Sequence, residues 1–432
     1  MNLSNAANSV AACLLGIATL QSPTPAAATC YAYVTNLEDD TVSVLDTATD
    51  TVISTIPIGD YPYGVAIHPD GNSVYVATGF SDRVTVLDPV AGVPVDSIPV
   101  GDFPHGLAIL PDGSRVYVTN EFDDTVSVID TASRTVVATV PVGSLPFGIT
   151  VSPGGELVLV ANFGDGTLSL IDPDGNSVIG TVTVPTGAIG VAVHPDGSKV
   201  YVTNDLEVGG MVTVLDTADG SVLSEIPVGS IPFEVALSPD GLRAYVSNEI
   251  SGDVSVIDTT IDEVIATIPV GVLPFGLAVH PDGSRIYVAI TGEDRLAVID
   301  AASLTVTDSV PLGTAPMGYG EFVGVGSCGR NVVSAEVTGS CPGAVSLTVA
   351  DATPDVQVFV AASQTEGLNL FTFGPCAGQV TDLVDPAPVA LLATDAAGGA
   401  SREVELDDGA CGFLLQIVDP FTCELSNVVG LP

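Results

Sequence analysis

Aromatic and imidazole side chains recur in this 432-residue sequence at steps of 42 residues, with one step of 44. The recurring residues that could hold a ligand are Tyr63, His105, Phe147, Phe233 and Phe275. Ile189 and Met317 occupy the two remaining equivalent positions. Aromatic faces bind cations and stack on sugar rings. We therefore treat this set as a candidate binding ring.

Carboxylates also recur in these repeats, in the loop between the second and third strands of each copy. Asp40 and Asp124 are representative. Beside aromatic rings they would suit a cationic ligand, a Ca²⁺-bridged partner or a sugar. Both sets also have a structural interpretation. The aromatic residues then pack one repeat against the next, and the loop aspartates make turns.

The sequence contains few motifs or residues that are typical of catalysis. The sequence contains no GxSxG elbow and no HExxH motif. His105 with Glu121 or Asp124 could act as base and partner in a lactonase-like hydrolysis. His105 is one histidine among seven related positions, so we expect no catalytic residue. The sequence has no CxxC pair and no cluster of histidines, so we also expect no metal site and no resident cofactor. Ca²⁺ is kept as one candidate ligand, and the lactonase is kept as the alternative function.

The elements that would position these residues belong to a repeat that fills residues 31–323. Each copy contains four short, β-branched runs and a turn that in five copies reads Pro-Asp-Gly, in which Pro and Gly set the turn dihedrals. Four strands per copy make one blade, and seven copies predict a seven-bladed β-propeller. The turn aspartates and His68, His194 and His280 beside them are expected to be structural.

The motifs Tyr-Val-Thr-Asn (residues 33–36, 117–120 and 201–204), TVSVID and IPVG resemble the YVTN-type β-propeller repeats. This resemblance covers residues 31–323. It implies a bacterial or archaeal surface-layer or secreted protein, and it carries no shared catalytic residue. WD-type repeats fit less well, because the chain contains no tryptophan.

The propeller is expected to be closed by both chain ends. The chain enters at the second strand of a blade, at Tyr31, and residues 316–323 occupy the missing first-strand register. A disulfide between Cys30 and Cys328, which flank these two strands, would clasp the ring. The cysteines Cys341, Cys376, Cys411 and Cys423 are expected to form disulfides in one of three pairings.

Composition changes on either side of the repeat. Residues 1–28 have the apolar run and small-residue site of a secretory signal but no basic start, so we interpret them as an atypical signal peptide. Residues 29–326 form the predicted propeller. Residues 327–432 show short alternating runs that predict a small immunoglobulin-like β-sandwich, so the chain is expected to be all-β.

The net charge of −43 comes from 52 acidic against nine basic residues. Such a surface repels nucleic acid and anionic membranes, so neither is an expected partner, and no membrane span is expected. The sequence predicts an extracellular or cell-surface binding protein whose partner is a cell-envelope component, a polysaccharide or a protein. A self-assembling structural envelope component is the third function considered.

Overall fold

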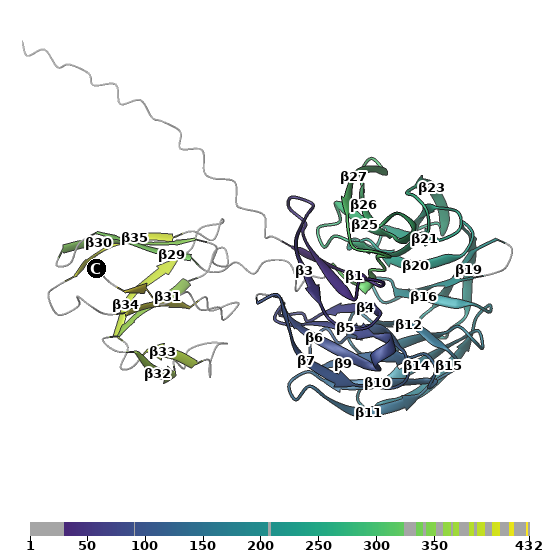
Figure 1. Cartoon of the computed structure of the whole chain (residues 1–432), viewed down its shortest axis with the longest axis horizontal. Helices are drawn as coiled ribbons and strands as arrows, with labels where there is room; N and C mark the ends of the chain where they lie inside the picture. The colour runs from purple at the N-terminus through teal and green to yellow at the C-terminus, as the bar shows by residue number, and fades with distance from the viewer. Residues whose placement is uncertain are drawn as a thin grey trace, which may run out of the picture. The chain divides into compact units, whose positions relative to one another are not determined.

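A computed structural model describes residues 30–323, except Val90 and 206–208, and the backbone of the strands between Ser334 and Gly430. One compact unit spans Ala28–Arg330, and a second includes Asn331–Pro432. The first unit is a propeller of seven antiparallel sheets around a central axis (Figure 1). The predicted all-β, seven-bladed fold is confirmed.

Blades are numbered here in chain order, and each runs from an inner to an outer strand. Blade 1 contains β1 (Tyr31–Asn36), β2 (Thr41–Asp46) and β3 (Thr51–Pro57). Blade 2 contains β4 (Pro62–Ile67), β5 (Val74–Thr78), β6 (Arg83–Asp88) and β7 (Val93–Pro99). Blade 3 contains β8 (Pro104–Ile109), β9 (Arg115–Asn120), β10 (Thr125–Asp130) and β11 (Thr135–Pro141). Blade 4 contains β12 (Pro146–Val151), β13 (Val158–Asn162), β14 (Thr167–Asp172) and β15 (Ser177–Thr183).

The remaining blades follow the same plan. Blade 5 contains β16 (Ala188–Val193), β17 (Lys199–Asn204), β18 (Met211–Asp216) and β19 (Val222–Pro227). Blade 6 contains β20 (Pro232–Leu237), β21 (Arg243–Asn248), β22 (Asp253–Asp258) and β23 (Glu263–Pro269). Blade 7 contains β24 (Pro274–Val279), β25 (Arg285–Ile290), β26 (Arg295–Asp300) and β27 (Thr305–Pro311). Two 3₁₀ turns, η1 (Gly79–Ser81) and η2 (Thr291–Glu293), lie between strands.

The ring closes through residues 316–323, as predicted, but not as a regular strand. Pro316 forms an antiparallel bridge with Asn36, and the Tyr33 amide donates to the Phe322 carbonyl at 2.9 Å. Between these contacts β28 (Tyr319–Glu321) pairs in parallel with β4 of blade 2. Gly318 and Gly320 have φ of 51° and 82°, which allow this detour into the channel.

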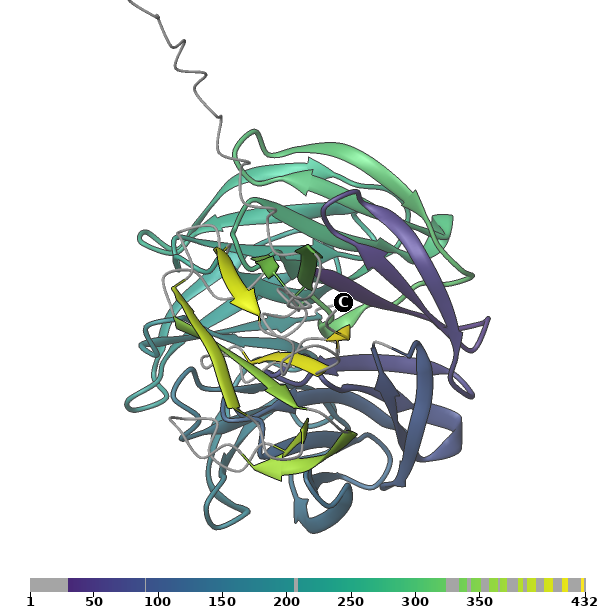
Figure 2. The same cartoon turned by 90° about the vertical axis from the view of Figure 1, so that its left-hand side faces the viewer.

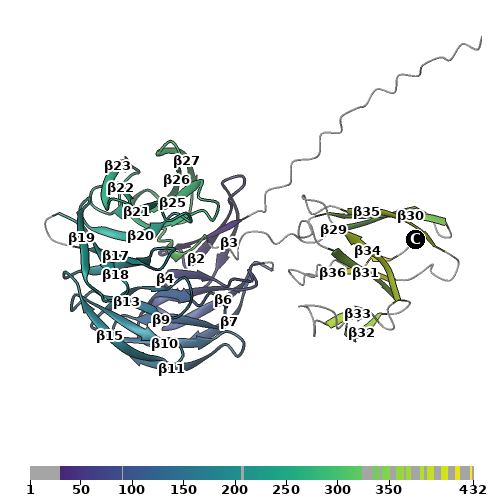
Figure 3. The same cartoon turned by 180° about the vertical axis from the view of Figure 1, so that it is seen from behind.

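Side chains join the first and last blades as well, and Figures 2 and 3 show the purple β1–β3 beside the green strands of blade 7. Asp50 accepts from Arg285 at 2.7 Å and from the Tyr287 hydroxyl at 2.9 Å. Cys30 is buried and disulfide-bonded. Its expected partner Cys328 lies outside the described residues, as do the four other cysteines of the C-terminal region, so all of these pairings stay predictions.

The residues of the repeat motif have separate structural tasks. The second-strand tyrosines are at most 2% exposed and fill the space between blades, with Leu159 in the fourth copy. The motif asparagine ties its strand to the next one, since Asn36 Nδ2 donates to Thr41 and Ser43, both at 2.9 Å. The motif threonine reaches the following blade, where Thr119 Oγ1 donates to the Phe147 carbonyl at 2.8 Å.

The aspartates and histidines of the Pro-Asp-Gly turns are structural, as predicted. Asp70 accepts from the Asn72 amide at 2.7 Å, and His68 Nδ1 lies 2.6 Å from Asp70. His68 Nε2 lies 2.9 Å from the Gly113 carbonyl of the next blade. Hydrogen bonds from Ser198 lower the pKa of the equivalent Asp196 to about 2.

The C-terminal unit consists of short antiparallel strands, and only their backbone is described. One sheet has β29 (Ser334–Gly339), β30 (Gly343–Ala350) and β35 (Ala400–Leu406). A second has β31 (Gln357–Ser363), β34 (Ala387–Ala393), β36 (Leu414–Val418) and β37 (Val429–Gly430). A third pairs β32 (Glu366–Leu370) with β33 (Val380–Leu383). The immunoglobulin-like type stays a prediction, and the signal at residues 1–28 lies outside the described residues.

Candidate functional site

The predicted aromatic ring lies around the central channel, but Tyr319 fills its middle. Tyr319 is 2% exposed, and its ring centroid lies 5.2 Å from that of His105, 5.8 Å from Phe147 and 5.5 Å from Phe233. Its hydroxyl donates to the Ile189 carbonyl at 3.3 Å. Tyr63 and Phe275 pack against the same cluster. The ring residues therefore form a packed plug, which we call the channel plug.

A buried carboxylate beside the plug was missed by the sequence interpretation. The position after each ring residue is glycine in six copies, at 64, 106, 148, 190, 276 and 318, but glutamate at 234. Glu234 is 7% exposed, and its Oε2 accepts from the Gly320 amide at 3.5 Å. The single departure from a glycine column was the signal that could have identified it.

His105, the base of the lactonase alternative, lies inside the plug. It is 1% exposed, and its ring centroid lies 4.3 Å from Tyr63 and 3.6 Å from Phe147. Its Nδ1 is buried and has no hydrogen-bond partner in the described part of the chain. Burial lowers the pKa of His105 to about 3, which makes the imidazole a weak base. A substrate on the loop face would have no direct path to it.

The loop carboxylates hold neighbouring loops in place. Asp40 and Asp124 have φ of 54° and 52°. Their Oδ1 atoms accept from the backbone amides of Tyr61 at 2.9 Å and Leu145 at 2.8 Å, each 21 residues further along. This geometry gives both aspartates a defined structural contact on the loop face.

An exposed aromatic surface covers the same loops in blades 2 and 3. Its residues, which we call the aromatic strip, are Tyr61, Phe80, Phe103 and Phe122. Phe80 is 65% exposed and Phe122 56%. Ring centroids lie 4.5 Å apart for Tyr61 and Phe80, 5.6 Å for Phe80 and Phe103, and 5.0 Å for Phe103 and Phe122. Sequence reasoning missed the strip because it considered one aromatic position per copy.

Two members of the strip occupy a costly backbone conformation. Tyr61 has φ of 61° and Phe103 of 55°. The equivalent residue of blade 5 is Gly187, which adopts φ of 77° without strain. Bulky residues at positive φ cost on the order of 1 kcal/mol each, and such strain often occurs at ligand-binding sites. Leu145, Ile231, Leu273 and Ala315 have the same positive φ at the equivalent position, so this conformation is a property of the repeat, and the strip differs only in the aromatic side chains placed there.

Carboxylates surround the strip. Asp60 and Asp102 are exposed and make no hydrogen bond or ion pair through their side chains to the described residues. Burial raises the pKa of Glu121. A carboxylate with a raised pKa is less favourable when ionised in the folded protein, so its ionisation reduces stability as pH rises above the unfolded pKa of about 4.3.

We therefore expect Glu121→Gln to raise the melting temperature at pH 7, on the order of 1 °C, because the side chain is partly exposed. The gain should disappear near pH 3, where Glu121 is protonated in both states. Glu38→Gln removes the same charge from an exposed loop position and is the control. Scanning calorimetry at both pH values measures the difference, and a gain that persists at pH 3 would contradict the assignment.

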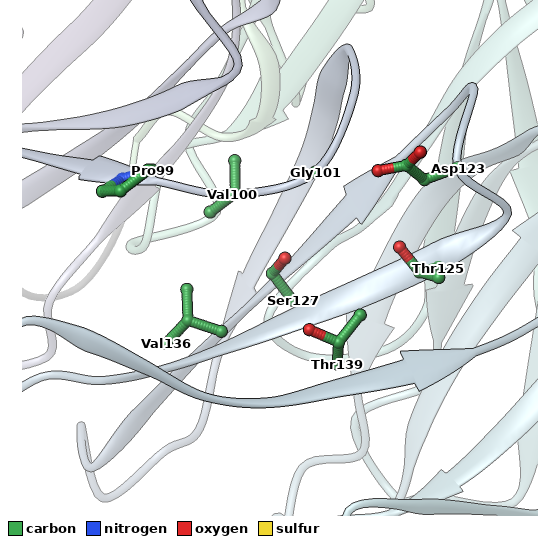
Figure 4. Close-up of a pocket in the computed structure, with 8 residues that line it drawn as sticks. All are labelled: Pro99, Val100, Gly101, Asp123, Thr125, Ser127, Val136 and Thr139. Atoms are coloured by element: carbon green, nitrogen blue, oxygen red, sulfur yellow. The ribbon is translucent and has the colours of Figure 1, made fainter.

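A pocket of about 400 Å³ opens between blades 2 and 3 (Figure 4). Pro99, Val100 and Val136 line one end of it, and Asp123, Thr125, Ser127 and Thr139 direct oxygen atoms into the rest. Gly101 completes the lining. The pocket was not predicted, since its residues come from two blades and include no unusual residue type.

The described residues contain no group of three or more histidine, cysteine, aspartate or glutamate side chains arranged to hold a metal ion. None of their helices is long and apolar enough to cross a membrane. The two extra residues that make one repeat 44 residues long lie between Asp205 and Met211, and 206–208 of this loop are outside the described residues.

The fold and the repeat define the chain as a seven-bladed β-propeller repeat protein. A model of the YNCE-like beta-propeller family matches residues 3–98 and 100–185, which is less than half of the chain. No curated protein shows significant sequence similarity.

Three solved structures have a similar fold. Hydrazine synthase of Kuenenia stuttgartiensis is 23% identical, with a TM-score of 0.55 over 59% of this chain and 87% of that one. A functionally unknown protein of Desulfotomaculum acetoxidans is 18% identical, with a TM-score of 0.59 over 68% and 100%. The dihydro-heme d1 dehydrogenase NirN, in complex with DHE, is 18% identical, with a TM-score of 0.51 over 71% and 79%. At these identities the likeness shows the fold alone, and the question of catalysis stays open.

Proposed function

We propose that this protein is a secreted or cell-surface binding protein that uses the loop face of blades 2 and 3 to bind a cell-envelope component. The observation that carries the proposal is the aromatic strip, in which Phe80 and Phe122 are more than half exposed. Contiguous exposed aromatic surface is unfavourable in water and commonly marks an interaction site. The resemblance to YVTN-type repeats supports an extracellular location.

The proposal depends on the surface rather than on the fold, because enzymes share this fold. The channel plug leaves His105 enclosed, whereas the strip is accessible to a large partner. The net charge of −43 would favour a partner that is neutral or positively charged. Ca²⁺ could strengthen such an attachment by joining carboxylates of the two partners.

Co-sedimentation of the full chain with cell envelopes of its source organism tests the proposal. We expect the double variant Phe80→Ala/Phe122→Ala to bind at least about tenfold more weakly, because central aromatic residues contribute most to binding. Ile179→Ala/Ile250→Ala removes side chains that are 64% and 60% exposed elsewhere and is the matched control. Equal binding by both double variants and the unmodified chain would reject the strip as the binding site.

A further inference from the structure

The aromatic strip and the pocket between blades 2 and 3 share the same two loops. Gly101 lines the pocket two residues before Phe103, and Asp123 lines it directly after Phe122. Asp123 Oδ2 also accepts from the Asp102 amide at 2.8 Å, which fixes one loop against the other. A ligand lying along the strip would therefore reach the pocket without crossing another element.

The pocket presents hydroxyl groups prepared to donate hydrogen bonds outward. Asn120 Nδ2 donates to Thr125 Oγ1 at 2.9 Å and to Ser127 Oγ at 3.0 Å. Because both oxygens accept from inside the blade, their protons are free for an outside acceptor. The Thr139 hydroxyl makes no hydrogen bond to the residues that the structure describes. Asp123 adds a carboxylate acceptor at the same end (Figure 4).

We propose that the strip and the pocket form one carbohydrate site for a neutral polysaccharide, an inference that rests on the proposed function and names its ligand class. Sugar rings have apolar C–H faces that stack on aromatic rings, and hydroxyls that both donate and accept. The strip supplies aromatic faces for stacking. The pocket supplies hydroxyl groups that donate hydrogen bonds and the Asp123 carboxylate, which accepts them. Its volume of about 400 Å³ lies within the range of small-ligand sites.

Charge selects a neutral polysaccharide over an acidic one. The seven basic residues of the described propeller are all engaged within it, for example Arg285 with Asp50 and Lys199 with Asp262. No free cation is available there to hold carboxylate or sulfate groups, and the net charge would repel them. A basic peptide would satisfy the carboxylates but would leave the Thr125, Ser127 and Thr139 hydroxyls unused.

Calorimetric titration of the full chain tests this inference. The probes are the hexasaccharides of cellulose, laminarin and starch, with hexalysine and an alginate hexamer as the charged alternatives. We expect at least one neutral hexasaccharide to bind. Phe103→Gly should weaken that binding at least about tenfold, because the stacking face is lost. This variant relieves the positive φ but also removes the ring contacts of Phe103 with Tyr63, Phe80 and Phe122, so its melting temperature is measured beside its binding.

Thr139→Val tests the pocket separately, since it removes one hydroxyl at nearly constant volume, and we expect a weakening of about fivefold. Leu273→Gly occupies the same backbone position as Phe103→Gly but lies in blade 7, and Thr181→Val repeats Thr139→Val in blade 4. Both controls should leave binding unchanged. Equal effects of the test and control variants would overturn the site, as would binding confined to hexalysine or alginate.

A second arm separates failure of this inference from failure of the proposed function. Envelopes are oxidised with periodate, which cleaves vicinal diols of sugars, or digested with protease, before co-sedimentation. A neutral-polysaccharide ligand predicts binding that protease spares, that the neutral hexasaccharides compete and alginate does not, and that periodate abolishes unless the sugar is 1,3-linked like laminarin, which has no internal vicinal diol. Strip-dependent binding that survives periodate and that none of the neutral hexasaccharides competes would overturn the carbohydrate inference while leaving the binding function intact. Binding that does not depend on the strip would overturn both.

Discussion

Tyr319→Ala is expected to destabilise the propeller by about 4 kcal/mol, because a large aromatic side chain is deleted from a close-packed interior. Tyr319 is 2% exposed and contacts the rings of His105, Phe147 and Phe233. These rings come from blades 3, 4 and 6, so the cavity would loosen several blades together. The expected result is a marked fall in the denaturant midpoint of the propeller transition, followed by near-ultraviolet circular dichroism.

Tyr319→Phe is the matched control for this variant. It keeps the ring and removes only the hydrogen bond to the Ile189 carbonyl, so we expect a loss of about 1 kcal/mol. If both variants lost the same free energy, the hydroxyl rather than the packing would hold the plug together. A wild-type midpoint for Tyr319→Ala would show that the plug contributes little to the ring.

Gly148→Ala is expected to cost about 3 kcal/mol, the upper part of the usual range for overpacking. A Cβ atom at Gly148 would overlap the backbone carbonyl of Ile189 in the next blade and lie 2.8 Å from the Tyr319 hydroxyl. Gly64, Gly106, Gly190 and Gly276 face carbonyl oxygens of their neighbouring blades in the same way. A carbonyl within a strand cannot turn aside, so the inner strands would have to separate.

Gly180→Ala provides the comparison, because it adds the same methyl group to β15 at ordinary φ. Its nearest neighbour would be the end of the Leu170 side chain at 3.3 Å, which can shift. We expect its stability to change by less than about 1 kcal/mol. Urea titration of the two variants would disprove the tight inner packing if Gly148→Ala were equally harmless.

The fold was predictable from sequence because the same pattern of four strands and turns recurs in seven copies. Short-range patterns reveal the period, the Pro-Asp-Gly turns and the first-strand register of residues 316–323. The structure confirms the seven blades and their closure by both chain ends. The detour of β28 was not predictable in the same way. It depends on Gly318 and Gly320 and on parallel pairing with β4, which lies more than 250 residues earlier.

The candidate site was predictable only in its location. Sequence placed Tyr63, His105 and Phe147 together at the channel, where the structure also places them. It could not foresee that Tyr319, from the far end of the repeat, would cover them. The strip was also missed, since it forms only where the turns that carry Phe80 and Phe122 both contact Phe103, and the repeat pattern does not record exposure.

The closing segment also determines how mechanical load would enter the propeller. The C-terminal unit follows that segment in the chain, so tension on the unit would pass through residues 316–323 before it reached the other described strands of the propeller. Peeling this segment away would remove Tyr319 from the plug and open the ring at blade 1. The predicted Cys30–Cys328 bond would divert the tension to the first strand of the chain and spare the plug. In the proposed envelope location, that disulfide would both close the ring and carry tension that would otherwise act on residues 316–323.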